Sequence, residues 1–226
     1  IIKSKLMTEP MQVNERMREL SLKMPVGSIV LTVVKCVEQM ALYYNQSKSI
    51  GTLKLNTPEE YVQNYVNEYY LMDMFYRRAL EAYHELVTLD IPIEAVINEA
   101  KRQLDQEYAK MANVMNLEWL TCVKEKGEAF RGVTLGRQQN FYRTEGDGTV
   151  KQVVIVSDAL RYEVAVELMQ QLAKEKHIAT LTPYLAMLPT ETKYCKPALL
   201  PHHSLGMLGT EMLVDGTVLN TTDQRT

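Results

Sequence analysis

The chain has 226 residues, of which 46% are hydrophobic and 23% are charged, as in ordinary globular proteins. It carries 25 Lys and Arg against 28 Asp and Glu, so the net charge of -3 gives no electrostatic reason to expect a protein that coats DNA or an anionic membrane. The three cysteines, Cys36, Cys122 and Cys195, are far apart and odd in number, which supports neither a disulfide framework nor a cysteine zinc knuckle.

The two ends of the sequence and its cysteine usage bear on where the protein resides. Free cysteines fit a reducing cytosol, so a cytoplasmic location is expected. The longest apolar stretch, residues 26–34, is much shorter than the roughly 20 residues that span a bilayer. The chain opens at Ile1 without a signal pattern and stops at Thr226 inside a polar run, so we expect a fragment, cut at both ends.

Residues 1–143 are predicted to be all helical, because apolar residues recur at three- and four-residue spacing. Thr57-Pro58-Glu59-Glu60 is typical of a helix N-terminus, with a hydroxyl cap, a proline in the first turn and acids at the positive helix end. That helix should reach about Thr88. A second long helix is predicted from Pro92 to Lys126, after a break at Asp90-Ile91-Pro92, and two shorter ones at residues 11–22 and 28–45.

Tyrosines recur near one face of the predicted helix that begins after Thr57. They are Tyr61, Tyr65, Tyr69, Tyr76 and Tyr83. Such a stripe more often packs against a neighbouring helix, with the hydroxyls reaching the rim, than it binds a partner protein. Both interpretations remain open at this point.

An α/β pattern follows Gly146-Asp147-Gly148. The β-branched run Val153–Val156 predicts a central parallel strand, residues 160–174 have helical spacing, and residues 177–184 predict a second strand. Two or three strands cannot form a covered sheet, so we expect a mainly parallel α/β domain that is incomplete here.

Asp158 directly follows the first predicted strand. Ligands of open α/β sheets bind beyond the carboxyl ends of the strands. A carboxylate there can ligate a divalent cation or accept a proton, although capping the next helix is the more common role of such an aspartate.

Two threonines lie in Leu188-Pro189-Thr190-Glu191-Thr192-Lys193, ahead of a short predicted helix at residues 194–200. A hydroxyl near a helix N-terminus can act as a nucleophile beside free N–H groups that bind a phosphate. Capping is again the more common role, and spacing alone does not decide between the two.

Together these stretches resemble the PglZ family, the alkaline-phosphatase-superfamily component of BREX phage-defence systems. The resemblance covers roughly residues 150–226. It rests on the eleven residues 153–163, on residues 188–193 with Pro197-Ala198-Leu199-Leu200-Pro201-His202 after them, and on Val214-Asp215-Gly216. It implies a helical region over residues 1–143 and, over residues 144–226, the N-terminal part of an alkaline-phosphatase-like α/β domain.

The resemblance implies specific roles for residues of the site. Asp158 becomes a ligand of a divalent metal, commonly zinc, and Thr192 the metal-bound nucleophile, with Thr190 as the fallback. Arg161 and Lys193 become candidate contacts to a substrate phosphate, although an ion pair for Arg161 and solvation of Lys193 are the more common roles. If Asp158 and Thr192 share one zinc, their oxygens should lie roughly 3 to 4 Å apart at one edge of the sheet.

The other residues of the carboxyl-terminal part have more ordinary expected roles. The superfamily's remaining Asp and His ligands are expected later in the chain, so residues 1–226 alone are predicted to be inactive. His202 and His203 are expected in a surface loop, and Asp215 and Asp223 in turns.

Two functions from different classes follow from the resemblance. The first is a metal-dependent phosphatase or phosphodiesterase that hydrolyses a phosphoryl ester within the defence system. The second is a non-catalytic scaffold with a phosphatase fold that binds other proteins of the defence complex. In both, those proteins are the expected partners, and DNA is a further candidate partner through them.

Overall fold

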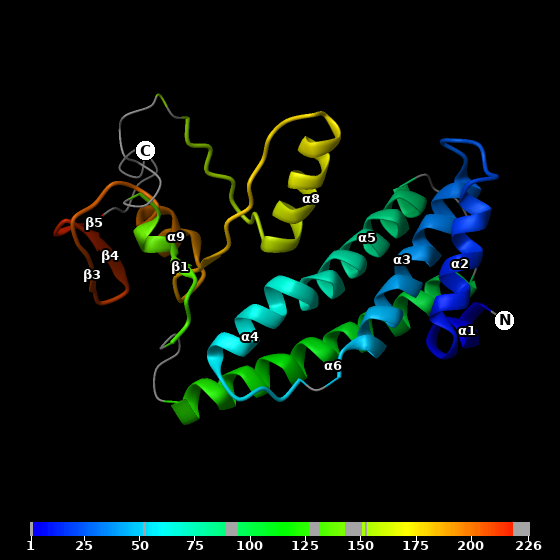
Figure 1. Ribbon diagram of the computed structural model, residues 1–226, viewed down its shortest axis with the longest axis horizontal. Coiled ribbons are helices and arrows are strands. Elements are labelled where there is room, and N and C mark those ends of the chain that lie inside the picture. Colours follow the sequence, from blue (N-terminus) through cyan, green and yellow to red (C-terminus); the bar gives the residue numbers. More distant parts are fainter. Residues whose placement is uncertain are drawn as a thin grey trace. The chain divides into compact units, whose positions relative to one another are not determined.

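The computed structural model describes residues 2–51, 53–88, 95–126, 132–142, 151 and 153–218 (Figure 1). The chain divides into two compact units, Ile1–Val133 and Thr134–Thr226. The boundary predicted between residues 143 and 144 lies outside the described residues and stays a prediction. The same holds for the breaks predicted at residues 90–92 and 146–148 and for the turn predicted at Asp223.

Every regular element described in the first unit is a helix, as the periodicity predicts. Its elements are α1 (Ile2–Thr8), α2 (Pro10–Ser21), α3 (Ile29–Ser49), α4 (Pro58–Asn64), the π-helix η1 (Tyr65–Tyr69), α5 (Tyr70–Thr88) and α6 (Ala95–Lys126). The predicted helix from Thr57 to Thr88 is therefore one continuous run of α4, η1 and α5. Among the described helices, none combines the length and the apolar character needed to cross a membrane.

Side-chain caps begin two of these helices. The Ser28 hydroxyl accepts a hydrogen bond from the Leu31 N–H, and the Thr57 hydroxyl accepts one from the Glu60 N–H. The Glu60 carboxylate in turn accepts the Asn56 N–H at 2.9 Å, which ties the residue before the cap to the first helical turn. Because each cap satisfies N–H groups that the helix itself leaves unpaired, these starts can be read from the sequence.

Helix α3 is the central element of the helical unit. It packs against α2 and α5, and α6 runs beside α3 and α5 (Figure 1). Met40 and Tyr43 of α3, Ala79 of α5 and Leu104 of α6 are all fully buried in one apolar cluster. At the other end of α6, Trp119 meets Tyr61 of α4 edge to face, with ring centroids 5.6 Å apart.

The tyrosine stripe packs largely between helices. Tyr61 is buried against Trp119, and Tyr76 of α5 stacks on Tyr108 of α6 with ring centroids 3.8 Å apart. The packing interpretation is confirmed for these two residues. Tyr65 and Tyr69 belong to the π-helix η1 and line a cavity together with residues of α5 and α6.

The second unit combines short strands with helices. Its described elements are β1 (Gly136–Arg137), the 3₁₀-helix η2 (Gln138–Asn140), α8 (Tyr162–Lys174), β2 (Tyr184–Leu185), α9 (Thr192–Ala198), β3 (Leu205–Leu208), β4 (Glu211–Val214) and β5 (Thr217–Val218). β1 pairs with β2 in parallel, and β3, β4 and β5 form an antiparallel sheet in that order. Helix α9 contacts both β4 and η2.

The central strand predicted at Val153–Val156 is not formed. These four residues belong to no strand and are exposed by 83, 62, 86 and 45%. A buried parallel strand exists only when neighbouring strands accept its backbone hydrogen bonds, and the described strands pair elsewhere. The second predicted strand, at residues 177–184, is also wrong except at its end, where Tyr184 begins β2.

The helical core provides a stability test within one helix. Leu104 is fully buried, whereas Leu117, also on α6, is 56% exposed. Leu104→Ala should lower the free energy of unfolding by about 2 to 5 kcal/mol, because it removes buried methyl groups and leaves a cavity. The measurement is urea unfolding followed by circular dichroism.

Leu117→Ala is the matched control, with an expected effect within about 0.5 kcal/mol. Equal losses of stability in the two variants would contradict the assignment of Leu104 to the core.

Candidate functional site

Asp158 and Thr192 lie together in the second unit. The Thr192 hydroxyl is 3.5 Å from one carboxylate oxygen of Asp158 and 3.4 Å from the other. Both residues are exposed, so a solute can reach the pair. The predicted separation of 3 to 4 Å is thus observed. The predicted sheet edge is not, because Val153–Val156 forms no strand that would place Asp158 there. The contact is long for a hydrogen bond between two oxygens, which leaves the pair open to other partners.

Neither residue caps a helix in the way that the alternative interpretation requires. The N-cap of α8 is Arg161 and the N-cap of α9 is Glu191, and neither of them uses its side chain as a cap. Thr192 is the first residue of α9 itself. The recorded partners of the Asp158 carboxylate are the Thr192 hydroxyl and the neighbouring Ala159 N–H at 3.0 Å.

A strained backbone residue follows the carboxylate. Ala159 has φ = 56°, in the left-handed region that residues other than glycine rarely adopt. Its carbonyl oxygen accepts the Arg161 N–H at 2.9 Å, which closes a tight turn before α8. This turn fixes where Asp158 leaves the backbone, and it holds the residue in a conformation that costs about 1 kcal/mol or more.

One side-chain amide holds both ends of the segment that carries the two threonines. The Gln138 Oε1 accepts the Met187 N–H at 3.0 Å, and its Nε2 donates to the Cys195 carbonyl oxygen at 3.1 Å. The sequence analysis missed Gln138, because a glutamine in a polar stretch carries no local signal of such a role. Residues 187–195 are thus fastened to η2 at both ends.

Cys195 is a second contact that sequence analysis missed. It lies three residues after Thr192 on α9, and its thiol contacts the carbonyl oxygens of Met187 and Pro189 at 3.7 and 3.8 Å. Burial is the main cause that raises the pKa of this thiol, and the negative charge of Asp158 adds to it. The thiol therefore stays protonated at neutral pH and can act as a hydrogen-bond donor within the loop.

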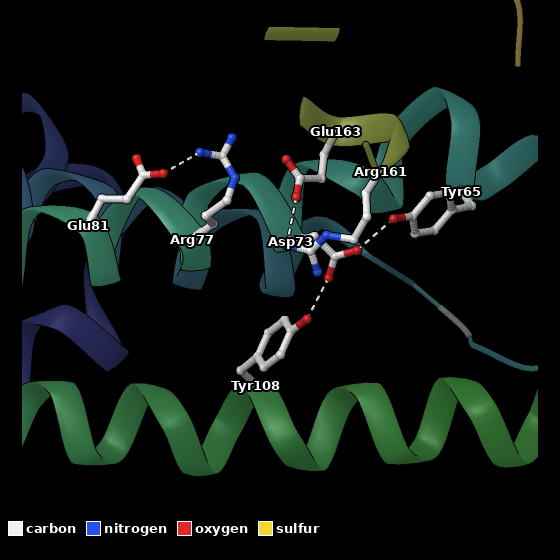
Figure 2. A network of polar contacts seen from close by, with 7 residues as sticks. All are labelled: Tyr65, Asp73, Arg77, Glu81, Tyr108, Arg161 and Glu163. Atoms are coloured by element: carbon white, nitrogen blue, oxygen red, sulfur yellow. Dashed lines mark hydrogen bonds and ion pairs between the residues drawn. The ribbon is translucent and has the colours of Figure 1, made fainter. Parts of the chain in front are cut away.

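The two candidate phosphate contacts are engaged in local ion pairs. Arg161 pairs with Glu163 at 3.0 Å, as drawn in Figure 2, and Lys193 pairs with Glu191 at 3.5 Å. Lys193 also lies over the Tyr194 ring at 4.7 Å. Thr190 is exposed and precedes α9. Of the two threonines, Thr192 is the one whose hydroxyl contacts Asp158 among the described residues.

Asp215 organises the loop that carries the two histidines. Its Oδ1 accepts the N–H groups of His203 and Ser204 at 2.9 and 2.7 Å, from the turn between β4 and β5. The predicted turn position of Asp215 is confirmed, and the His203 side chain is 99% exposed. The Ser204 N–H, followed by that of His203, lowers the pKa of Asp215.

The Gln138 contact predicts a local loss of protection. In Gln138→Ala the Met187 N–H loses its acceptor, so its hydrogen exchange should accelerate by about 2- to 10-fold, which matches the net contribution of one hydrogen bond. Exchange followed by NMR gives the rate. Gln139→Ala, one residue away on η2, should leave the exchange rate of the Met187 N–H unchanged. An unchanged rate in Gln138→Ala would argue against the hydrogen bond between Gln138 and Met187.

The Asp215 contacts predict a pH dependence at acid pH. Because the pKa of Asp215 is lower when folded than the ordinary 3.8, the carboxylate stabilises this loop above pH 3.8 and loses that effect as the pH falls through the lowered pKa. NMR should show the His203 and Ser204 amide shifts titrating below pH 3.8. Asp215→Asn should abolish this titration and Glu211→Gln should keep it, whereas a midpoint at or above 3.8 would refute the contact.

Comparison with known proteins places the second unit among relatives. Residues 139–226 match the family model described as the BREX system PglZ alkaline phosphatase-like domain. The chain is 45% identical over 76 residues to the alkaline phosphatase-like protein BrxZ of Escherichia coli O9:H4 (strain HS), a match over 30% of this chain and 9% of that protein. It is 27% identical over 154 residues to the alkaline phosphatase-like protein PglZ of Bacillus cereus (strain H3081.97), a match over 66% of this chain and 18% of that protein.

The chain therefore corresponds to a small part of the length of these curated relatives. No solved structure matches it. The family match includes Asp158, Arg161, Thr190, Thr192 and Lys193, the residues on which the sequence resemblance depends. The resemblance is confirmed: residues 139–226 are similar to the PglZ alkaline phosphatase-like domain of BREX systems.

Proposed function

We propose that this chain is part of a metal-dependent phosphatase or phosphodiesterase of a bacterial BREX defence system. One observation carries the proposal: the Thr192 hydroxyl lies 3.4 Å from the Asp158 carboxylate, although 34 residues separate them in sequence. A nucleophilic hydroxyl beside a carboxylate is an arrangement that can transfer a phosphoryl group. The names of the relatives, which are alkaline phosphatase-like, support the same reaction class.

The two oxygens fit a shared divalent cation. A zinc ion binds oxygen ligands at about 2.0 to 2.2 Å, so two ligands of one ion lie up to roughly 4 Å apart. The distances of 3.4 and 3.5 Å fall within that limit. Asp158 and Thr192 would hold the ion, and further ligands would have to come from elsewhere, because the described residues contain no group of three His, Cys, Asp or Glu suited to a metal. When bound, such a cation lowers the pKa of the hydroxyl and stabilises charge on a phosphoryl oxygen.

The proposed chemistry of the chain's own residues is a two-step transfer. The Thr192 oxygen forms a bond to phosphorus while the bond to the leaving alcohol breaks, and water then cleaves the phosphothreonine to restore the hydroxyl. Asp158 accepts the hydrogen bond of the hydroxyl and orients its lone pair. The two hydrogen bonds of Gln138 and the strained turn at Ala159 hold Thr192 and Asp158 close together.

Arg161 and Lys193 are the proposed substrate contacts. Each is paired with a glutamate close in sequence, at 3.0 and 3.5 Å. The Lys193–Glu191 pair is exposed and contributes about 1 kcal/mol or less, so a phosphate dianion can replace Glu191 as the partner of Lys193. The Glu163 carboxylate is buried, so Arg161 keeps this pair and offers its remaining N–H donors to the phosphate. The guanidinium of Arg161 can bind two phosphoryl oxygens at once.

The similarity of the matched region to a BREX family supports other proteins of the defence system as partners. We extend this to a cytoplasmic complex that reaches DNA through those partners. The scaffold function, in which the phosphatase fold binds these proteins without catalysis, is the alternative outcome of the experiment below.

Replacement of the nucleophile is the direct test. In the natural protein that contains this sequence, Thr192→Val should lower phosphodiester hydrolysis by about a thousandfold or more, because it removes the attacking oxygen but keeps the volume of the side chain. Turnover of bis(p-nitrophenyl) phosphate with added zinc gives the rate. Asp158→Asn should weaken activity and zinc affinity together, since both oxygens of the pair are ligands in the proposal.

Two controls separate chemistry from folding. Thr190→Val should keep activity near that of the natural protein, and Thr192→Ser should keep much of it because the hydroxyl remains. If the Thr192→Val protein were as active as the natural protein, Thr192 would be excluded as the nucleophile. If the natural protein hydrolysed no phosphodiester with any divalent metal, the scaffold function would be favoured.

A further inference from the structure

The helical unit contains a cavity of its own, whereas the Asp158 and Thr192 pair belongs to the second unit. The cavity has a volume of about 190 Å³ and opens between η1, the start of α5 and the middle of α6. Tyr65, Tyr69, Asp73 and Tyr108 line it, together with Ala112 and Met115. Three aromatic rings and a carboxylate thus surround a space large enough for a small organic group.

The carboxylate of Asp73 is the charged group of this cavity. It accepts the Tyr65 hydroxyl at 2.6 Å and the Tyr108 hydroxyl at 2.8 Å, one on each oxygen (Figure 2). Both recorded partners are neutral hydroxyls, so they orient the carboxylate without cancelling its charge. A carboxylate offers about four lone-pair sites, so two acceptor sites remain for a ligand.

The aromatic wall is held rigid from behind. Tyr108 stacks on Tyr76 with an angle of 5° between the rings, and the Tyr76 hydroxyl donates to Asp105 at 3.0 Å. Tyr65 and Tyr69 come from the π-helix η1, and such segments are frequent at functional sites. Preorganised tyrosine rings around an anion are the chemistry that attracts an organic cation.

We propose that this cavity binds a guanidinium group on a short alkyl chain. Two N–H donors of the planar guanidinium match the two remaining acceptor sites of the Asp73 carboxylate, and its faces suit the tyrosine rings. The volume holds the cation and a few methylene groups but not a drug-sized molecule. The ligand is a free alkylguanidine or an arginine side chain of another protein, and both present the same cation.

The test is a titration of the full chain with ethylguanidinium, followed by NMR of tyrosine ring signals. Binding should shift the signals of Tyr65, Tyr69 and Tyr108, and the neutral analogue ethylurea should not. Asp73→Asn should weaken binding at least about tenfold, because it removes the charge from two hydrogen bonds to the cation. Glu99→Gln is the matched control, since Glu99 lies on α6 and pairs with Arg102 but does not line the cavity, and it should bind as the natural chain does.

A second variant keeps the test valid if Asp73→Asn fails to fold. Ala112→Leu leaves the carboxylate in place and fills the cavity, so it should also abolish the shifts. Blocked arginine, acetylated and amidated at its ends, separates the two sources: binding comparable to that of ethylguanidinium indicates a protein side chain, and failure to bind indicates a free small molecule. Equal binding by ethylurea, or unchanged binding in Ala112→Leu, would overturn the proposal. Neither outcome bears on the role of Thr192, because Asp73 and Ala112 belong to the first unit and Thr192 to the second.

Discussion

The hydrogen bonds of one amide side chain govern the geometry of the candidate site. Gln138 joins Met187 and Cys195 to η2, so the segment between them, which includes Thr192, is fixed at both ends. A loop with free ends samples many conformations, and the entropy of ordering it opposes any defined contact. With its ends fixed, the segment can hold a hydroxyl against the carboxylate of Asp158, which is anchored separately by its own tight turn.

The two units use different means of stabilisation. In the helical unit, α3 buries one face against α2 and α5, and stability comes from apolar area and from capped helix ends. Among the described residues, the second unit has short strands and fewer buried side chains than the first, so individual hydrogen bonds such as those of Gln138 and Asp215 contribute more to its local order. This difference is consistent with a site that has to admit solvent and solute.

The helices were predictable from sequence because their signals are local. Thr57 and Glu60 specify a helix start within four residues, and the apolar spacing specifies the buried face. The strand predicted at Val153–Val156 is not formed, because a strand depends on a neighbour that no local pattern identifies. The approach of Thr192 to Asp158 followed from family resemblance, whereas Gln138 gave no signal, since its two contacts lie 49 and 57 residues away.

The single tryptophan has a consequence for spectroscopy. The chain contains one tryptophan, Trp119, and it sits edge to face against Tyr61 where α4 meets α6. Fluorescence excited at the red edge of the tryptophan absorption band therefore comes from one helix–helix contact. The second unit contains no tryptophan and does not contribute to this emission. The wavelength of the Trp119 emission maximum therefore reports whether α6 remains packed against α4. Denaturation followed by fluorescence and by far-ultraviolet dichroism can thus separate the opening of the first unit from changes in the second without any introduced label.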